Sequence, residues 1–191
     1  MAGRPSRWIV PVIAGYFAFK GLIAEGTSAE KSLALGGLYH WTALIGLAVV
    51  AGLAMQRGRS STGSWWGDVR KIAQPLLLYS LLASLSVLAW NHGIAKETTN
   101  LRLALREAQI MEATATEATF QAWVGDAGLE EGAWIPDREV YREQALSQVR
   151  WMLSPSVMFV FSLLTYAVAS IALALATSLL LHKIWSITSL G

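Results

Sequence analysis

The sequence predicts an all-α integral membrane protein, a four-helix bundle with an extramembrane helical hairpin between its third and fourth spans. The first observation is composition: 54% of the 191 residues are hydrophobic and 15% are charged, whereas soluble domains carry about 25% charged residues. The second is that the apolar residues gather in four long runs. The third is a charged, helix-forming segment between the last two runs, residues 94–152. Together these observations exclude an ordinary soluble protein.

Each apolar run is long enough to cross a bilayer, which takes about 20 helical residues. The predicted spans are residues 8–24, 33–55, 72–91 and 153–181. Arg4 and Arg7 before the first run are also typical of a signal peptide, but Lys20 interrupts that run, so we expect it to be retained as a span. The predicted parts are three spans with their loops, the hairpin, and the last span with its tail: residues 1–93, 94–152 and 153–191.

The charge distribution predicts the orientation. The N-terminus, the loop between spans two and three, and the C-terminus together carry a net charge of +6, and the 94–152 segment carries −4. Basic residues near membrane ends stay in the cytoplasm, so both termini are expected there and the hairpin in the periplasm of a bacterial inner membrane. The basic residues form no cluster on one polar surface, so no nucleic-acid partner is expected.

Tryptophan positions favour the same orientation, because indole rings prefer the level of the lipid headgroups. The residues at the predicted inner boundary are Trp8, Trp65, Trp66 and Trp185, and those at the outer boundary are Trp90 and Trp151. Membrane lipids are therefore the first expected partners.

The hairpin is predicted from helix propensity. Residues 96–123 lack Pro and Gly, which predicts one helix continuing out of the third span. Its small residues recur at alternating three- and four-residue spacing and form a seam: Leu101, Ala104, Ala108, Met111, Ala115, Ala118 and Ala122. Pro136 and Asp137 are typical of the start of a second helix. We expect that helix to run into the fourth span, with Pro155 bending it rather than ending it.

Lys20 is the clearest ionisable residue at membrane depth, where a charge is costly. Two interpretations stay open. The favoured one is that its ammonium reaches the headgroups along an apolar stem. The other is a buried role, such as pairing with Glu25 or Glu30.

The histidines are the candidates for cofactor binding. His40 and His92 fall in the same half of the predicted bundle, where two imidazoles can ligate a haem iron or relay protons. One histidine per span does not make a complete metal site, so hydrogen-bonded packing is the favoured interpretation. His182 is expected at the inner boundary, where a helix C-terminus favours positive charge.

No catalytic motif is present, and the chain contains no cysteine. The acidic pairs Glu130–Glu131 and Asp137–Glu139 do not have the spacing of a calcium loop. We therefore expect no enzymatic activity, no metal and no bound cofactor.

Small residues in the spans indicate close helix packing. In the fourth span they are Ala167, Ser170, Ala174 and Ser178, and the earlier spans contain Ala14 with Ala18 and Ala48 with Gly52. These residues either pack within one bundle or form a docking face for another subunit.

Three segments carry a resemblance to a known family: RWMLSP at 150–155, LLLHK at 179–183 and SSTGSWW at 60–66. The chain resembles a four-span membrane protein family found chiefly in Bacteroidota, domain of unknown function 4199. It departs from that family in Ser154, where members more often have Asn, and in its Trp content. The resemblance implies fold and membrane location, with no established activity and no functional residues.

The sequence has few residues that could carry out catalysis and many small residues suited to helix packing. This favours a non-catalytic accessory or assembly subunit, which contacts other subunits or a second copy of itself. One alternative is an oligomeric transporter or channel with a central path faced by Lys20, Tyr39, His40 and His92. Another is a haem- or cofactor-associated redox subunit that uses His40 and His92.

Overall fold

The computed structural model describes residues 5–24, 26–57, 64–126 and 137–188, and every regular element within these ranges is helical. The chain divides into two compact units, each described here by itself. Unit 1 contains Met1–Trp90 and Phe159–Gly191, and unit 2 contains Asn91–Met158. The parts predicted from the sequence change after residues 93 and 152, whereas the two units meet after Trp90 and Met158.

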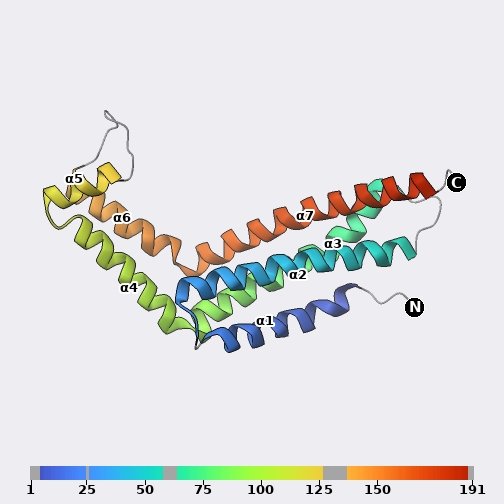
Figure 1. Cartoon of the computed structure of the whole chain (residues 1–191), viewed down its shortest axis with the longest axis horizontal. Coiled ribbons are helices and arrows are strands. Elements are labelled where there is room, and N and C mark those ends of the chain that lie inside the picture. Colours follow the sequence, from blue (N-terminus) through green and yellow to red (C-terminus); the bar gives the residue numbers. More distant parts are fainter. Residues whose placement is uncertain (1–4, 25, 58–63, 127–136, 189–191) are drawn as a thin grey trace. The chain divides into compact units, whose positions relative to one another are not determined.

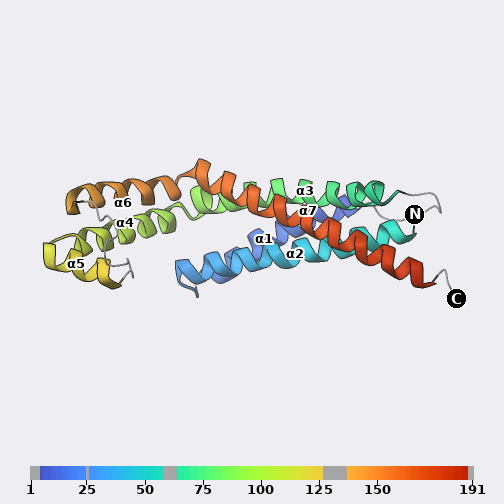
Figure 2. The ribbon, with the colours of Figure 1, turned by 90° about the horizontal axis from the view of Figure 1, so that it is seen from above.

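Unit 1 is built from long helices that run side by side (Figures 1 and 2). They are α1 (Ile9–Ala24) after a 3-10 turn at Pro5–Trp8, α2 (Ala29–Arg57), α3 (Trp65–Leu88) and most of α7 (Pro155–Thr188). Four segments are long and apolar enough to cross a membrane: Pro5–Ala24, Glu30–Arg57, Trp65–Ile94 and Pro155–Lys183. The predicted all-α, four-span architecture is therefore confirmed. The start of α1 and the end of α7 lie at the same end of unit 1 (Figure 1), which we call the terminal end.

Large apolar side chains lie both inside unit 1 and on its outer surface. Ile72, Leu76 and Ala174 are fully buried between the helices. Phe161 and Val168 on α7, by contrast, are 73% and 66% exposed. Exposed apolar surface on this scale needs an apolar environment, and four helices long and apolar enough to cross a membrane fit one made of lipid.

Two glycines allow close contacts between helices. A Cβ atom on Gly52 of α2 would lie 2.7 Å from Cγ2 of Thr177 in α7. A Cβ atom on Gly15 of α1 would lie 2.6 Å from the Tyr39 hydroxyl, which donates a hydrogen bond of 2.8 Å to the carbonyl of Val12. Small residues at these positions therefore serve packing within the bundle.

The helix of the third span does not continue unbroken into the hairpin. α3 starts at an N-cap, where the Ser64 side chain accepts a hydrogen bond from the Gly67 amide. After Leu88 the chain makes a π-helical turn over Ala89–Ile94, and Ala95 (φ −103°, ψ 36°) precedes the next helix. The prediction of one continuous helix out of the span is therefore wrong.

The described part of unit 2 includes α4 (Lys96–Ala113), α5 (Glu117–Asp126) and α6 (Arg138–Met152). The helix predicted over residues 96–123 is thus divided in two. Thr116 and Thr119 explain the division, because each side-chain hydroxyl accepts a hydrogen bond from the other residue's amide. This reciprocal arrangement caps a new helix at its N-terminus. Pro136, the expected start of the second hairpin helix, lies outside the described residues, and Asp137 is the N-cap of α6.

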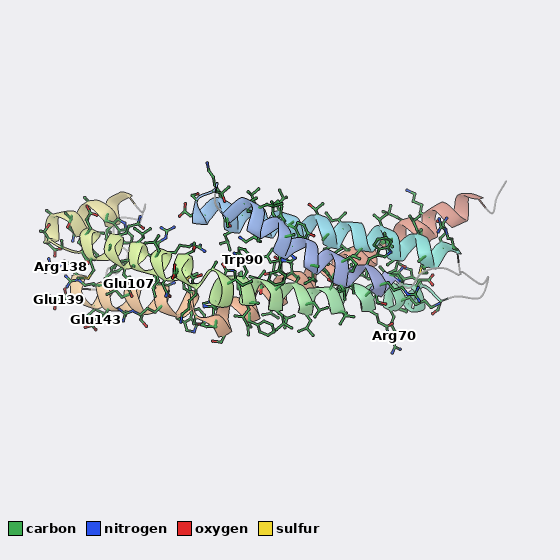
Figure 3. The ribbon with its side chains drawn as sticks, turned by 90° about the horizontal axis from the view of Figure 1, so that it is seen from below. Arg70, Trp90, Glu107, Arg138, Glu139 and Glu143 are labelled. Carbon is green, nitrogen blue, oxygen red and sulfur yellow. The ribbon has the colours of Figure 1, made fainter. Side chains whose placement is uncertain are left out.

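Polar contacts join α4 to α6. Glu107 and Arg150 form an ion pair with an O–N distance of 2.6 Å. Arg142 donates to the carbonyl and the hydroxyl of Thr114, at 2.9 and 3.1 Å, and Arg138 donates to the Ala115 carbonyl at 3.2 Å. In Figure 3, Glu107 extends from α4 and Arg138 from α6. The two arginines thus satisfy carbonyls at the end of α4, which favours positive charge.

Aromatic rings join α5 to α6. The Tyr141 ring lies 5.3 Å from the ring centroids of both Phe120 and Trp123. Phe120 is 2% exposed and Val124 4% exposed. Burial in this cluster raises the pKa of the Tyr141 phenol.

The second hairpin helix ends before the fourth span begins. α6 stops at Met152, and Pro155 is the first residue of α7. The Met158 amide donates to the Ser154 carbonyl, 3.0 Å away, which closes the first turn of α7. Pro155 starts the helix instead of bending it, because a helix's first position needs no backbone N–H donor. The predicted bend is corrected to a break at Leu153–Ser154.

Replacing Arg142 with alanine is expected to loosen the end of α4. Thr114 is fully buried, so its carbonyl would lose its donor at a cost of about 1 kcal/mol. Hydrogen–deuterium exchange of residues 110–124 should accelerate in the Arg142→Ala protein. The control is Arg106→Ala, because Arg106 is exposed and donates to Gln109 within α4 itself. Equal exchange in both variants would contradict the capping role.

Candidate functional site

Lys20 lies inside unit 1 and does not reach outward. Lys20 is 2% exposed. Its Nζ donates hydrogen bonds to the carbonyl and the hydroxyl of Ser32, at 2.9 and 2.5 Å. The ammonium also lies 5.4 Å from the centroid of the Trp90 ring, a cation–π contact. The favoured prediction that it reaches the headgroups is therefore wrong, and a buried role is correct. Glu25, one of the partners considered, lies outside the described residues.

His40 lies at the centre of unit 1 and is fully buried. Its Nδ1 is 2.8 Å from the Tyr79 hydroxyl, and its Nε2 is 3.5 Å from the Ser86 hydroxyl. Each helix of the unit places a tyrosine ring near the imidazole. They are Tyr16 of α1, Tyr39 of α2, Tyr79 of α3 and Tyr166 of α7, with centroid distances of 4.2 to 6.0 Å.

The hydrogen bonds around His40 define one neutral tautomer. Ser86 donates its own proton to the Ala83 carbonyl at 2.7 Å, so its oxygen can only accept from the imidazole. Nε2 then carries the proton, and Nδ1 accepts from Tyr79. Because both ring nitrogens face hydroxyls, this geometry fits hydrogen-bonded packing better than ligation of a haem iron.

His92 has a different environment. It lies in the π-helical turn and is half-buried, with its Nε2 3.2 Å from the Met158 sulfur in unit 2. Among the described residues, no group of three or more His, Asp or Glu side chains is arranged to hold a metal ion. The contacts of His40 and His92 thus do not favour a shared cofactor site.

The small-residue seam of the fourth span faces inward. Ser170, Ala174 and Ser178 are fully buried and Ala167 is half-buried. Ser170 contacts Ser80 of α3, with 2.7 Å between the hydroxyl oxygens. Ala48 and Gly52 of α2 are also buried, whereas Ala14 and Ala18 of α1 are exposed. Packing within the bundle is therefore correct for the seam of α7, and the docking interpretation is wrong there.

Sequence reasoning missed a buried acid at the terminal end. Asp68 in the first turn of α3 is 1% exposed, and its Oδ2 lies 3.4 Å from the His182 Nε2 of α7. The contact is an ion pair when the imidazole is protonated. In the sequence Asp68 is one acidic residue of the basic loop between spans two and three, and its position four residues before Ile72 is the signal for burial.

The hairpin seam faces outward. Ala104, Ala108 and Ala115 are exposed, and the larger side chains beside them, Leu101, Leu105 and Met111, are 59%, 56% and 49% exposed. The face of α4 that is covered lies about one position away on the helix and contains Leu103, Glu107, Ile110 and Thr114. The side chains of the seam are therefore exposed within the described part of unit 2.

The tryptophans divide into exposed and buried groups. Trp8, Trp66 and Trp151 are 58%, 67% and 64% exposed, as expected for side chains at the lipid interface. Trp65 is half-buried against Trp66, with ring centroids 4.5 Å apart. Trp90 is 8% exposed and lies inside unit 1 (Figure 3), so its predicted lipid contact is replaced by Lys20. The side chain of Trp185 lies outside the described residues.

In comparisons with known proteins, no family model matches the chain, and no curated protein or solved structure matches it either. The resemblance to family 4199 thus remains a prediction. Two features of the protein bear on its function: the exposed seam of the hairpin and the buried polar residues of unit 1.

Proposed function

We propose that the chain is a non-catalytic accessory or assembly subunit of a bacterial inner-membrane protein complex. The observation that carries the proposal is the exposed seam of α4, which has small and apolar side chains at helix-packing intervals. The hairpin does not use this face for its own packing. A partner helix can approach closely at Ala104 and Ala108 of α4 and at Ala115 just beyond its end, and larger side chains beside them supply apolar area.

The proposed orientation follows the charge distribution. The terminal end, with its excess of basic residues, lies in the cytoplasm, and the hairpin lies in the periplasm. In this orientation the seam of α4 meets periplasmic parts of other membrane proteins. The exposed Ala14 and Ala18 of α1 offer a second contact, within the bilayer.

An oligomeric pore lined by Lys20 and His40 receives less support. Both side chains are buried among helices of their own chain, so they cannot face a path between subunits without repacking of unit 1. A redox role is also less supported, because both nitrogens of His40 face hydroxyl groups.

The test is purification from native membranes in mild detergent after brief crosslinking, with the wild type, Ala108→Glu and Gln109→Glu compared. Both variants add one carboxylate to an exposed position of α4, but only Ala108 lies in the seam. A stoichiometric partner should be retained by the wild type and Gln109→Glu and reduced about tenfold in Ala108→Glu, since a desolvated charge costs at least 1–3 kcal/mol at an interface. If Ala108→Glu and Gln109→Glu retain equal amounts of the partner, the seam is not the contact surface. An absorbance spectrum of the same sample tests the haem alternative.

A further inference from the structure

Buried polar residues follow the inward faces of α3 and α7 along unit 1. The two helices are antiparallel, and two contacts fix their register: Ser80 with Ser170 and Asp68 with His182. The same register places Leu76 opposite Ala174 and Ile72 opposite Ser178. Most buried polar groups of unit 1 therefore lie along one line of the bundle and not at scattered positions.

The first polar cluster begins at Lys20 and includes His40. Lys20 and Tyr16 meet at Gly36, where an added Cβ atom would lie 3.5 Å from the Lys20 Cδ and from the Tyr16 hydroxyl. Tyr16 lies against His40, with ring centroids 4.2 Å apart. His40 in turn contacts Tyr79 and Ser86. Lysine, tyrosine and histidine are thus placed in sequence from the α1–α2 turn to the centre of the bundle.

Serine hydroxyls extend this cluster toward the terminal end. Ser84 donates to the Ser80 carbonyl at 2.8 Å, and Ser80 donates to the Leu76 carbonyl at 2.9 Å. The Ser170 hydroxyl oxygen lies 2.7 Å from that of Ser80 and 3.2 Å from the Leu76 carbonyl. All three serines are fully buried.

Apolar side chains at two successive levels, which we call the layer, then interrupt the polar residues: Leu76 with Ala174, and Ile72 opposite Ser178. Ile72, Leu76 and Ala174 are fully buried there, with Leu44 and Leu47 of α2 in the same core. The interruption extends from Ser170 to Ser178, eight helical residues or roughly 12 Å. Such a layer excludes water and blocks ion or proton movement by dewetting.

Polar residues resume directly beyond the layer. Ser178 is fully buried, and its hydroxyl has no hydrogen-bond partner within the described residues. An unsatisfied buried hydroxyl is normally satisfied by water. One helical turn further along α7, His182 contacts Asp68 and is 37% exposed by its side chain. This second group of polar residues therefore extends from the buried hydroxyl to a partly exposed side chain at the terminal end.

We propose that unit 1 contains a proton pathway that is closed by the layer of Ile72, Leu76 and Ala174. One ring nitrogen of His40 takes a proton from the hydroxyl beside it, which regains one from water, and the ring becomes an imidazolium. The other nitrogen then releases its proton to the hydroxyl on its side, which passes one on to water, and the ring is neutral again. The two nitrogens face different partners, Tyr79 and Ser86, as this transfer requires. The proton then crosses the layer only when water enters it, and leaves through Asp68 and His182.

Within the described residues, the tyrosine and serine side chains that face His40 come from all four helices of unit 1. α1 contributes Tyr16, with Lys20 beyond it, α2 contributes Tyr39, α3 contributes Tyr79 and Ser86, and α7 contributes Tyr166. Lys20 is the only one of these that carries a charge at neutral pH. The proposal is independent of partner binding by the hairpin, and either can fail without the other.

The test opens the layer by adding a hydroxyl. Ala174→Ser continues the four-residue spacing of Ser170 and Ser178, and Ile72→Thr adds a hydroxyl on the facing helix. The matched control is Ala176→Ser, which makes the same change at an exposed position of α7. Each full-length protein is reconstituted into sealed vesicles that contain a pH-sensitive dye, and an outward potassium gradient with valinomycin drives protons inward.

Ala174→Ser and Ile72→Thr should each raise the initial rate of internal acidification about tenfold over wild type and Ala176→Ser, as expected when a dewetted barrier is hydrated. Adding His40→Phe to Ala174→Ser should return the rate to that of wild type, because phenylalanine fills the ring site without a nitrogen. Size-exclusion profiles before reconstitution show that the compared proteins are folded. The proposal is overturned if both layer variants match Ala176→Ser, or if the faster rate persists without His40.

Discussion

Gly52→Ala should lower the stability of unit 1 by roughly 1–3 kcal/mol, because overpacking strains a close helix contact. The new Cβ atom would lie 2.7 Å from Cγ2 of Thr177 and 3.4 Å from a methyl carbon of Leu181. Threonine is β-branched and has little freedom about χ1 in a helix, so α2 and α7 must move apart. The measurement is the midpoint of thermal loss of monodisperse protein in detergent.

The matched control is Gly46→Ala in the same helix, where no atom lies within 4 Å of the added Cβ. Alanine has the higher helix propensity by about 1 kcal/mol, so this variant should be as stable as wild type or more stable. Thr177→Ser should rescue Gly52→Ala, since it removes the methyl group that would collide. If Gly52→Ala and Gly46→Ala have the same midpoint, the close contact between α2 and α7 is wrong.

The span architecture could be predicted from the sequence because it depends on a local and additive property. Each span needs one run of about 20 apolar residues to cross a bilayer, whatever the rest of the chain contains. The break at Thr114–Thr116 was harder to predict. Threonines are tolerated within helices, and here the hydroxyls of Thr116 and Thr119 cap a new helix instead.

The environment of Lys20 could not be predicted, because its position near a span end permits two outcomes. The stem can extend to the headgroups, or the ammonium can turn inward if a neighbouring helix offers acceptors. Ser32, twelve residues later, provides both its carbonyl and its hydroxyl. Gly36 leaves the space that the lysine stem and Tyr16 occupy. The outcome thus depends on the pairing of α1 with α2.

The hairpin seam illustrates the difference between a pattern and its partner. The three- and four-residue spacing correctly indicates a continuous face on α4, but the face that contacts α6 contains Glu107 and Thr114. Arginines of α6 select that polar face, which no apolar periodicity identifies. The pairing of Asp68 with His182 could not be predicted for a similar reason, because it joins residues that lie far apart in the sequence.

Tyr79→Phe should destabilise unit 1 by about 1–3 kcal/mol, the usual cost of leaving a buried polar atom without its partner. The Tyr79 hydroxyl lies 2.8 Å from Nδ1 of His40, and both residues are fully buried. Phenylalanine preserves the ring packing against His40 and removes only the donor. Thermal midpoints in detergent, compared with those of wild type, measure the loss.

The double variant His40→Phe/Tyr79→Phe separates this hydrogen bond from general packing. Removing both partners leaves no unsatisfied Nδ1, and replacing a buried pair with apolar groups of similar shape is often close to neutral. The double variant should therefore be more stable than the sum of the two single effects, with a coupling of about 1–2 kcal/mol. Strictly additive losses would mean that His40 and Tyr79 do not interact, and the proton pathway through His40 would then lose its hydrogen-bonded partner on α3.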